Sequence, residues 1–64
     1  MTFRVKKGRG FGDEGMVFTV PVIARKFNGY KVQAEDGEGT AFLCFEDIEI
    51  LALTDEEKAL DVEL

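Results

Sequence analysis

Clusters of turn-forming residues cut this chain into short runs, and those runs carry β-type patterns. Four glycines fall within Gly8–Gly15, Asn28–Gly29 separates two apolar runs, and Glu35–Gly39 combines acidic residues with glycine. Segments of this composition continue neither a helix nor a regular strand. The runs between them alternate apolar with polar residues or are rich in valine, isoleucine and phenylalanine, which predicts strands. The sequence therefore predicts a mostly-β fold.

The first two predicted strands are Phe3–Lys7 and Met16–Lys26. In the first, Phe3 and Val5 alternate with basic residues, the period-two pattern of a half-buried strand. The second is long and contains Pro21, which has no N–H to give to a central ladder. We therefore expect a bulge, a bend or an edge position at Pro21, and a bend would let one sheet fold over on itself.

A hairpin and two further strands follow. Asn28–Gly29 favours a two-residue type I′ turn, because both residues tolerate positive φ. The strand after it alternates cleanly and is expected to point three side chains inward: Tyr30, Val32 and Ala34. Thr40–Phe45 and Ile48–Leu51 are the last two predicted strands, joined at Glu46–Asp47 by one expected 3₁₀ turn.

The last residues differ in character from residues 1–53, the expected barrel domain. Thr54 and Glu57 have the spacing of a capping box, and acidic residues in the first turn suit a helix N-terminus. Leu53, Leu60 and Leu64 form an apolar stripe. A helix of about ten residues is marginal on its own. Residues 54–64 are therefore expected to be an acidic helix where they pack on the barrel or on a partner, and a frayed tail otherwise.

Length and composition limit how such a fold is stabilised. Sixty-four residues make one domain, with one cysteine and no histidine. An intramolecular disulfide is thus impossible, and a zinc site would have a poor ligand set. Six phenylalanines and the β-branched residues must supply the core. The unpaired thiol suits a reducing cytoplasm, and neither a signal peptide nor a membrane span is expected.

Three stretches together resemble the Src-homology-3-like small barrels, and among these the KOW type most: Gly15–Val20, Asn28–Val32 and the pattern Ala41-x-Leu43-x-Phe45-x-x-Ile48-Glu49. The resemblance implies a five-stranded small barrel over residues 3–51, here followed by the short C-terminal helix. Similar patterns occur in small bacterial and phage barrels, so a bacterial or phage origin is expected. The resemblance carries no catalytic residues. The chain lacks the Ala-Leu-Tyr-Asp-Tyr motif and paired tryptophans of peptide-binding Src-homology-3 domains, so polyproline recognition is not expected.

Charge is strongly segregated along the chain. Residues 1–31 carry seven basic and two acidic side chains, a net of +5, whereas residues 32–64 carry one basic and eleven acidic, a net of −10. Such polarity orients an encounter with a charged partner. It also has a plain interpretation, because a small soluble domain needs surface charge in any case.

The functional hypothesis is a non-enzymatic protein-binding module, such as a small inhibitor or accessory subunit, that docks on a larger, partly basic protein. Its acidic and apolar face is expected to include Glu35, Asp36, Glu38, Phe42, Glu46, Asp47 and Glu49. The plain alternative is that these carboxylates form a solvated face. Val17, Ile23, Phe42 and Cys44 exceed what one small core holds, and an exposed surplus of apolar side chains marks a docking patch.

The alternative hypothesis is KOW-like binding of nucleic acid or ribonucleoprotein through the basic half. The residues for it are Arg4, Lys6, Lys7, Arg9, Phe11, Arg25, Lys26 and Lys31. An isoelectric point near 4.5 opposes it, since nucleic-acid-binding domains commonly exceed 9. Basic residues on strands also have a plain role in protecting sheet edges from aggregation.

No enzymatic, metal or cofactor site is expected. Gly10, Gly12 and Gly15 match a dinucleotide-binding pattern, but a strand follows them where that site requires a helix. Cys44 has no histidine to activate its thiol, so a packed thiol is expected.

Overall fold

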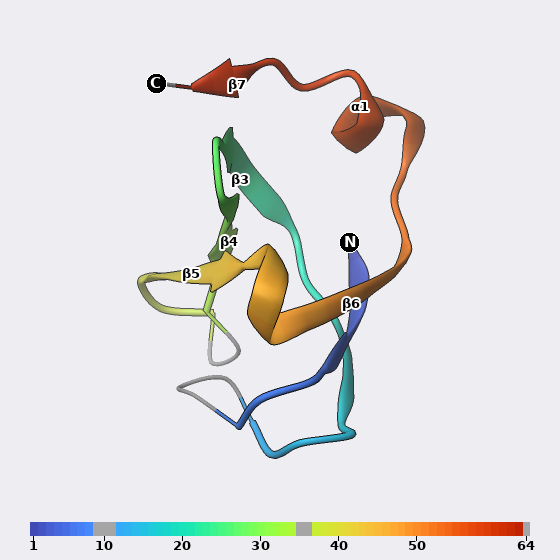
Figure 1. Ribbon diagram of the computed structural model, residues 1–64. Coiled ribbons are helices and arrows are strands. Elements are labelled where there is room, and N and C mark those ends of the chain that lie inside the picture. Colours follow the sequence, from blue (N-terminus) through green and yellow to red (C-terminus); the bar gives the residue numbers. More distant parts are fainter. Residues whose placement is uncertain (9–11, 35–36, 64) are drawn as a thin grey trace.

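Seven strands, one 3₁₀ turn and one short helix make up the computed structural model, which describes residues 1–8, 12–34 and 37–63 (Figure 1). In chain order the elements are β1 (Thr2–Val5), β2 (Val17–Thr19), β3 (Val22–Lys26), β4 (Gly29–Gln33), β5 (Thr40–Cys44), η1 (Phe45–Asp47), β6 (Ile48–Ala52), α1 (Asp55–Lys58) and β7 (Val62–Glu63).

The strands form two sheets, with orders β2-β1-β6 and β5-β4-β3-β7. Every pairing is antiparallel except the one between β3 and β7. The mostly-β prediction is confirmed, but the prediction of five strands is wrong. Two strands were missed, because the run Met16–Lys26 divides into β2 and β3 and the tail adds β7. Among the described strands no pairing links the two sheets into a closed barrel.

Of the bulge, bend or edge position predicted at Pro21, the structure has the bend. β2 ends at Thr19 and β3 begins at Val22. The Val20 N–H donates to the Met1 carbonyl at 3.0 Å, and the Pro21 carbonyl accepts from the Gln33 N–H at 3.1 Å. The chain thus leaves β1 of one sheet and joins β4 of the other within two residues. Proline suits this position because the bend requires no N–H from it.

The core lies between the two sheets. Phe3 on β1 and Val32 on β4 are fully buried, and the other buried apolar residues are Met1, Val5, Val20, Ala24, Tyr30, Leu43 and Ile48. The rings of Phe3 and Phe18 lie 5.8 Å apart between centroids. Burial of each large side chain contributes roughly 1.5–3 kcal/mol. The inward orientation predicted for Tyr30 and Val32 is confirmed, whereas Ala34 lies beyond the end of β4 and is only half-buried.

The predicted type I′ turn at Asn28–Gly29 is wrong. Lys26 pairs with Gly29, so the loop residues are Phe27 and Asn28. No described residue other than glycine has positive φ, which a type I′ turn requires at both loop positions. Gly29 instead belongs to β4, where a Cβ would collide with the Leu43 carbonyl oxygen on β5. Glycine is needed here for the close approach of two strands.

Residues 53–63, which follow β6 and are named here the strap, lie across one end of the fold (Figure 1). The capping box is confirmed, since the Glu57 N–H donates to Thr54 Oγ1 at 3.1 Å and the Thr54 N–H to Glu57 Oε1 at 2.9 Å. The predicted short C-terminal helix is confirmed, but α1 spans only four residues and the chain then extends into β7. β7 pairs with the end of β3, Val62 opposite Arg25. Leu53 and Leu60 are half-buried, and Leu64 lies outside the described residues.

Candidate functional site

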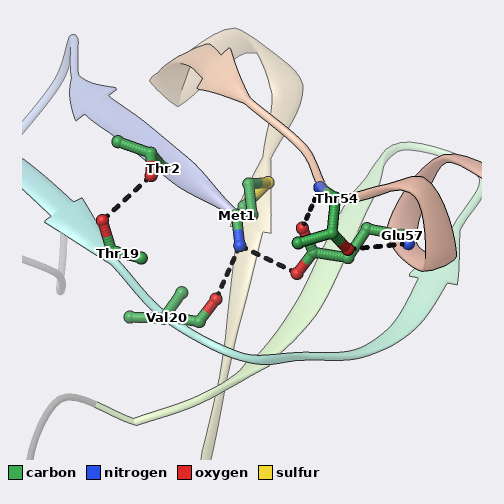
Figure 2. A network of polar contacts seen from close by, with 6 residues as sticks. All are labelled: Met1, Thr2, Thr19, Val20, Thr54 and Glu57. Carbon is green, nitrogen blue, oxygen red and sulfur yellow. Dashed lines mark hydrogen bonds and ion pairs between the residues drawn. The ribbon is translucent and has the colours of Figure 1, made fainter.

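A polar network joins the strap to the first strand (Figure 2). The Met1 α-amino group donates to Val20 O and to Glu57 Oε2, each at 2.8 Å. Both partners of this ion pair are largely shielded, since the side chain of Met1 is fully buried and that of Glu57 is 13% exposed. Burial alone would raise the pKa of Glu57. The hydrogen bond from the α-amino group and that from the Thr54 N–H outweigh it and leave the pKa lowered. The network holds the strap in place and leaves no reactive group open.

A different region combines exposed apolar and acidic side chains: Thr40–Asp47, named here the β5–η1 segment. β5 is an edge strand of the four-stranded sheet. Leu43 is only 4% exposed, whereas Phe42 is 44% exposed, because successive residues of a strand point to opposite faces. Phe45, at the start of η1, is 37% exposed and contacts Tyr30 edge to face, with ring centroids 5.6 Å apart. Two phenylalanines therefore reach solvent within four residues.

Exposed apolar side chains elsewhere bear out part of the predicted surplus. Val17 and Ile23 are exposed, as Phe42 is, while Cys44 is half-buried. Among the large apolar residues that the structure describes, Phe27 at the β3–β4 turn has the largest exposed fraction. Sequence reasoning missed Phe27 and Phe45, because it placed Phe27 beside a different turn and treated Phe45 as a strand residue.

Carboxylates follow directly after β5. Glu46 is exposed and forms no ion pair with a described residue. Asp47 is half-buried, and its carbonyl accepts from the N–H groups of Lys6 and Lys7 at 2.8 and 3.2 Å. Asp47 Oδ1 is buried without a hydrogen-bond partner among the described residues. η1 is thus fixed to the end of β1 through its backbone while it presents negative charge beside Phe45.

The other predicted protein-binding residues are distributed around this segment. Glu38 lies in the turn that precedes β5 and is exposed. Glu49 lies on β6, where its Oε1 is 2.6 Å from Arg4 Nη1, so its charge is balanced within the chain. Glu35 and Asp36 lie outside the described residues. The structure therefore gathers Phe42, Glu46 and Asp47 on one continuous segment.

The basic residues of the nucleic-acid hypothesis come from strands of both sheets, and two of them already pair with carboxylates. Arg4 pairs with Glu49, and Lys26 Nζ lies 3.7 Å from Glu63 Oε1. The Arg25 guanidinium lies over the Tyr30 ring, 6.0 Å from its centroid. Lys6 and Lys7 are exposed just after β1, and Lys31 is half-buried on β4. Arg9 and Phe11 lie outside the described residues.

Tyr30, the aromatic residue that lies beside Arg25, is 3% exposed. Stacking of a nucleic-acid base requires an open aromatic face. Tyr30 therefore packs in the core and does not serve as such a platform.

Chemistry-bearing clusters are not found in the part of the chain that the structure describes. No three side chains of histidine, cysteine, aspartate or glutamate gather there as candidate metal ligands. None of the helices formed by the described residues is long and apolar enough to cross a membrane. Comparisons with protein-family models, with curated proteins and with solved structures found no match to this chain.

Proposed function

We propose that this chain is a non-enzymatic protein-binding module of the Src-homology-3-like small-barrel type. It docks on a larger protein through the β5–η1 segment, as an accessory subunit or small inhibitor would. The observation that carries this proposal is the exposure of Phe42 and Phe45 on an edge strand and its following turn. They lie next to Glu46, whose charge is not paired with any described residue. Exposed apolar area with a charged rim is typical of a protein interface.

Features of the fold support the small-barrel part of the proposal. The segment β2–β3 bends at Pro21 and contributes to both sheets. The 3₁₀ turn η1 lies between β5 and β6, the last strand of the three-stranded sheet. A bent strand lets a short sheet fold over on itself, as a small barrel requires, and η1 lies within the pattern Ala41 to Glu49 that carries the resemblance.

The charge of the second half of the chain favours a basic partner surface. Residues 32–64 carry a net charge of −10. A partner pocket that takes Phe42 and is rimmed by lysine or arginine would face Glu46. Electrostatic complementarity of this kind mainly raises the association rate, and the gain falls with ionic strength.

Nucleic-acid binding is the second candidate, and one observation favours it. Lys6 and Lys7 are exposed next to each other where β1 ends. A mobility-shift series in rising salt, with both lysines changed to glutamate, tests it: binding that these changes abolish would support this second candidate.

Affinity capture from cells that make the protein tests the first candidate. The capture compares the unchanged protein with the double variant Phe42→Ala, Glu46→Lys. The matched control is Phe27→Ala, Glu56→Lys, which removes an even more exposed ring and an exposed carboxylate from other regions. We expect one or more proteins to be lost with the first variant and kept with the second. A captured set that is the same for all three proteins contradicts the proposal.

A further inference from the structure

β5 is an edge strand without the usual protection against strand pairing. Its residues Thr40–Cys44 include no charged residue and no proline, and its register with β4 runs without a bulge. Natural sheets protect their edges with lysine, proline, bulges or very short strands. An unprotected edge of five residues is therefore either an aggregation hazard or a place where another strand pairs.

The ladder with β4 shows which backbone groups of β5 face outward. The Phe45 N–H donates to Asn28 O at 3.0 Å, and the Ala34 N–H donates to Gly39 O at 3.2 Å. Hydrogen-bonded and non-hydrogen-bonded pairs alternate along an antiparallel ladder. By the register between those two bonds, Ala41 and Leu43 are in hydrogen-bonded pairs with β4. The N–H and C=O groups of the other three residues consequently face the open edge: Thr40, Phe42 and Cys44.

Other edges in the described part of the fold are less suited to receive a strand. β2 has three residues and leads into Pro21. β6 carries Glu49, and its register with β1 is interrupted at Thr2/Phe3. The end of β3 is already paired with β7, at Arg25 and Lys26, which leaves only three of its five residues beside that pairing. β5 therefore offers the longest regular edge among these strands.

A second copy of this chain is a poor occupant of that edge. An antiparallel copy centred on Phe42 would place position 46 opposite position 38, both glutamates, and a parallel copy would place Glu46 beside Glu46. Like charges opposite each other destabilise a strand pair, and each copy carries a net charge of −5. Lysine or arginine at the ends of an incoming strand would instead meet carboxylates at both ends of β5.

We propose that the larger partner contributes an extended segment, apolar at its centre and basic at its ends, which adds to the four-stranded sheet as a strand beside β5. This inference rests on the proposed function and specifies how the partner is held. Backbone hydrogen bonds to Thr40, Phe42 and Cys44 give affinity, and an apolar side chain of the segment packs against Phe42. The basic ends face Glu38 and Glu46.

Cys44→Pro tests the inference with little change to the chain. Cys44 has φ −74°, within the range of proline, and its N–H faces away from β4. The variant therefore removes an outward hydrogen-bond donor and keeps the ladder, while Cys44→Ala is its control. The probe is a phage-displayed library of random peptides long enough to span the strand, selected on the unchanged protein. Thermal unfolding of both variants measures how far their folds are kept.

We expect the selected peptides to be basic at their ends, to bind Cys44→Ala as they bind the unchanged protein, and to bind Cys44→Pro about tenfold more weakly. A selected peptide N-methylated at the amides that face β5 should also lose binding to the unchanged protein. This second measurement holds even where Cys44→Pro fails to fold.

Strand addition would be overturned if the selected peptides bound Cys44→Pro as tightly as the unchanged protein and if the N-methylated peptide bound as tightly as the unmodified one. In that case loss of peptide binding by Phe42→Ala, Glu46→Lys would still support docking through side chains, so failure of the two proposals is distinguishable. Selection of acidic peptides, or of none, would overturn the inference.

Discussion

The α-amino group of Met1 is hydrogen-bonded to the carboxylate of Glu57, 56 residues away, at 2.8 Å. The same carboxylate closes the capping box by accepting from the Thr54 N–H. Met1 also donates to Val20 at the bend between the sheets. The Glu57 side chain on α1 thus binds the start of the chain at Met1, and Met1 in turn binds the bend at Val20. This position explains how so short a helix is held in place.

Glu57→Gln should destabilise the fold by about 1.5–3 kcal/mol, the range for a hydrogen bond to a charged group. The change removes the negative charge that faces the α-amino group and keeps nearly the same shape. The measurement is urea unfolding of a protein prepared with Met1 unmodified. Glu56→Gln, on an exposed residue of the same helix, should change the free energy of unfolding by much less. Equal effects of the two changes would show that the ion pair contributes nothing specific.

The contribution of Glu57 should also depend on pH. Its pKa in the folded protein lies below the ordinary value of 4.5. The stabilisation is therefore fully present above pH 4.5 and is lost as the pH falls through the lowered pKa. The difference in unfolding free energy between the unchanged protein and Glu57→Gln should accordingly shrink below pH 4.5. A difference that grew on acidification would contradict the direction of the shift.

Gly29→Ala should destabilise the fold by about 3 kcal/mol, at the upper end for overpacking, because the added Cβ collides with the Leu43 carbonyl. Gly15→Ala is the comparison, since Gly15 has φ +89° and open space around its Cα. It should cost about 1–2 kcal/mol from backbone strain alone. Thermal unfolding of both variants measures the order. A smaller loss at position 29 than at position 15 would show that the strands separate easily there.

Local signals in the sequence predicted much of the fold. Pro21 marks the bend because it lacks an N–H, Thr54 and Glu57 mark the helix start by their spacing, and a kink was expected where η1 forms. Asn28–Gly29 gave a wrong turn prediction, because Gly29 is needed for the close approach of β5 and not for the turn. Turn propensities of neighbouring residues carry no information about such a contact. β7 was missed for a similar reason, since Val62 pairs with Arg25 far back in the chain.

For the candidate site, the sequence indicated the exposed apolar character of β5 but not its geometry. Phe42 is one of the apolar residues that exceed what one small core holds. The position of β5 at a sheet edge, and the outward direction of the Phe42 N–H, depend on which strands pair. Glu49 was grouped with the docking residues because the sequence does not show that Arg4 lies beside it.

Amide hydrogen exchange should alternate along β5 in the free protein. Ala41 and Leu43 should exchange slowly because their N–H groups face β4, while Thr40, Phe42 and Cys44 should exchange quickly from the open edge. Residue-resolved nuclear magnetic resonance at low protein concentration measures this. Slow exchange at Phe42 would mean that the edge is already covered.

Photo-crosslinking tests the docking surface most directly. A photoreactive phenylalanine analogue replaces Phe42 in one protein and Phe27 in another, both exposed phenylalanines of the same chain. After irradiation of living cells, the account predicts a discrete crosslinked protein from position 42 and none from position 27. Crosslinks from position 27 without any from position 42, or crosslinks to nucleic acid alone, would contradict it.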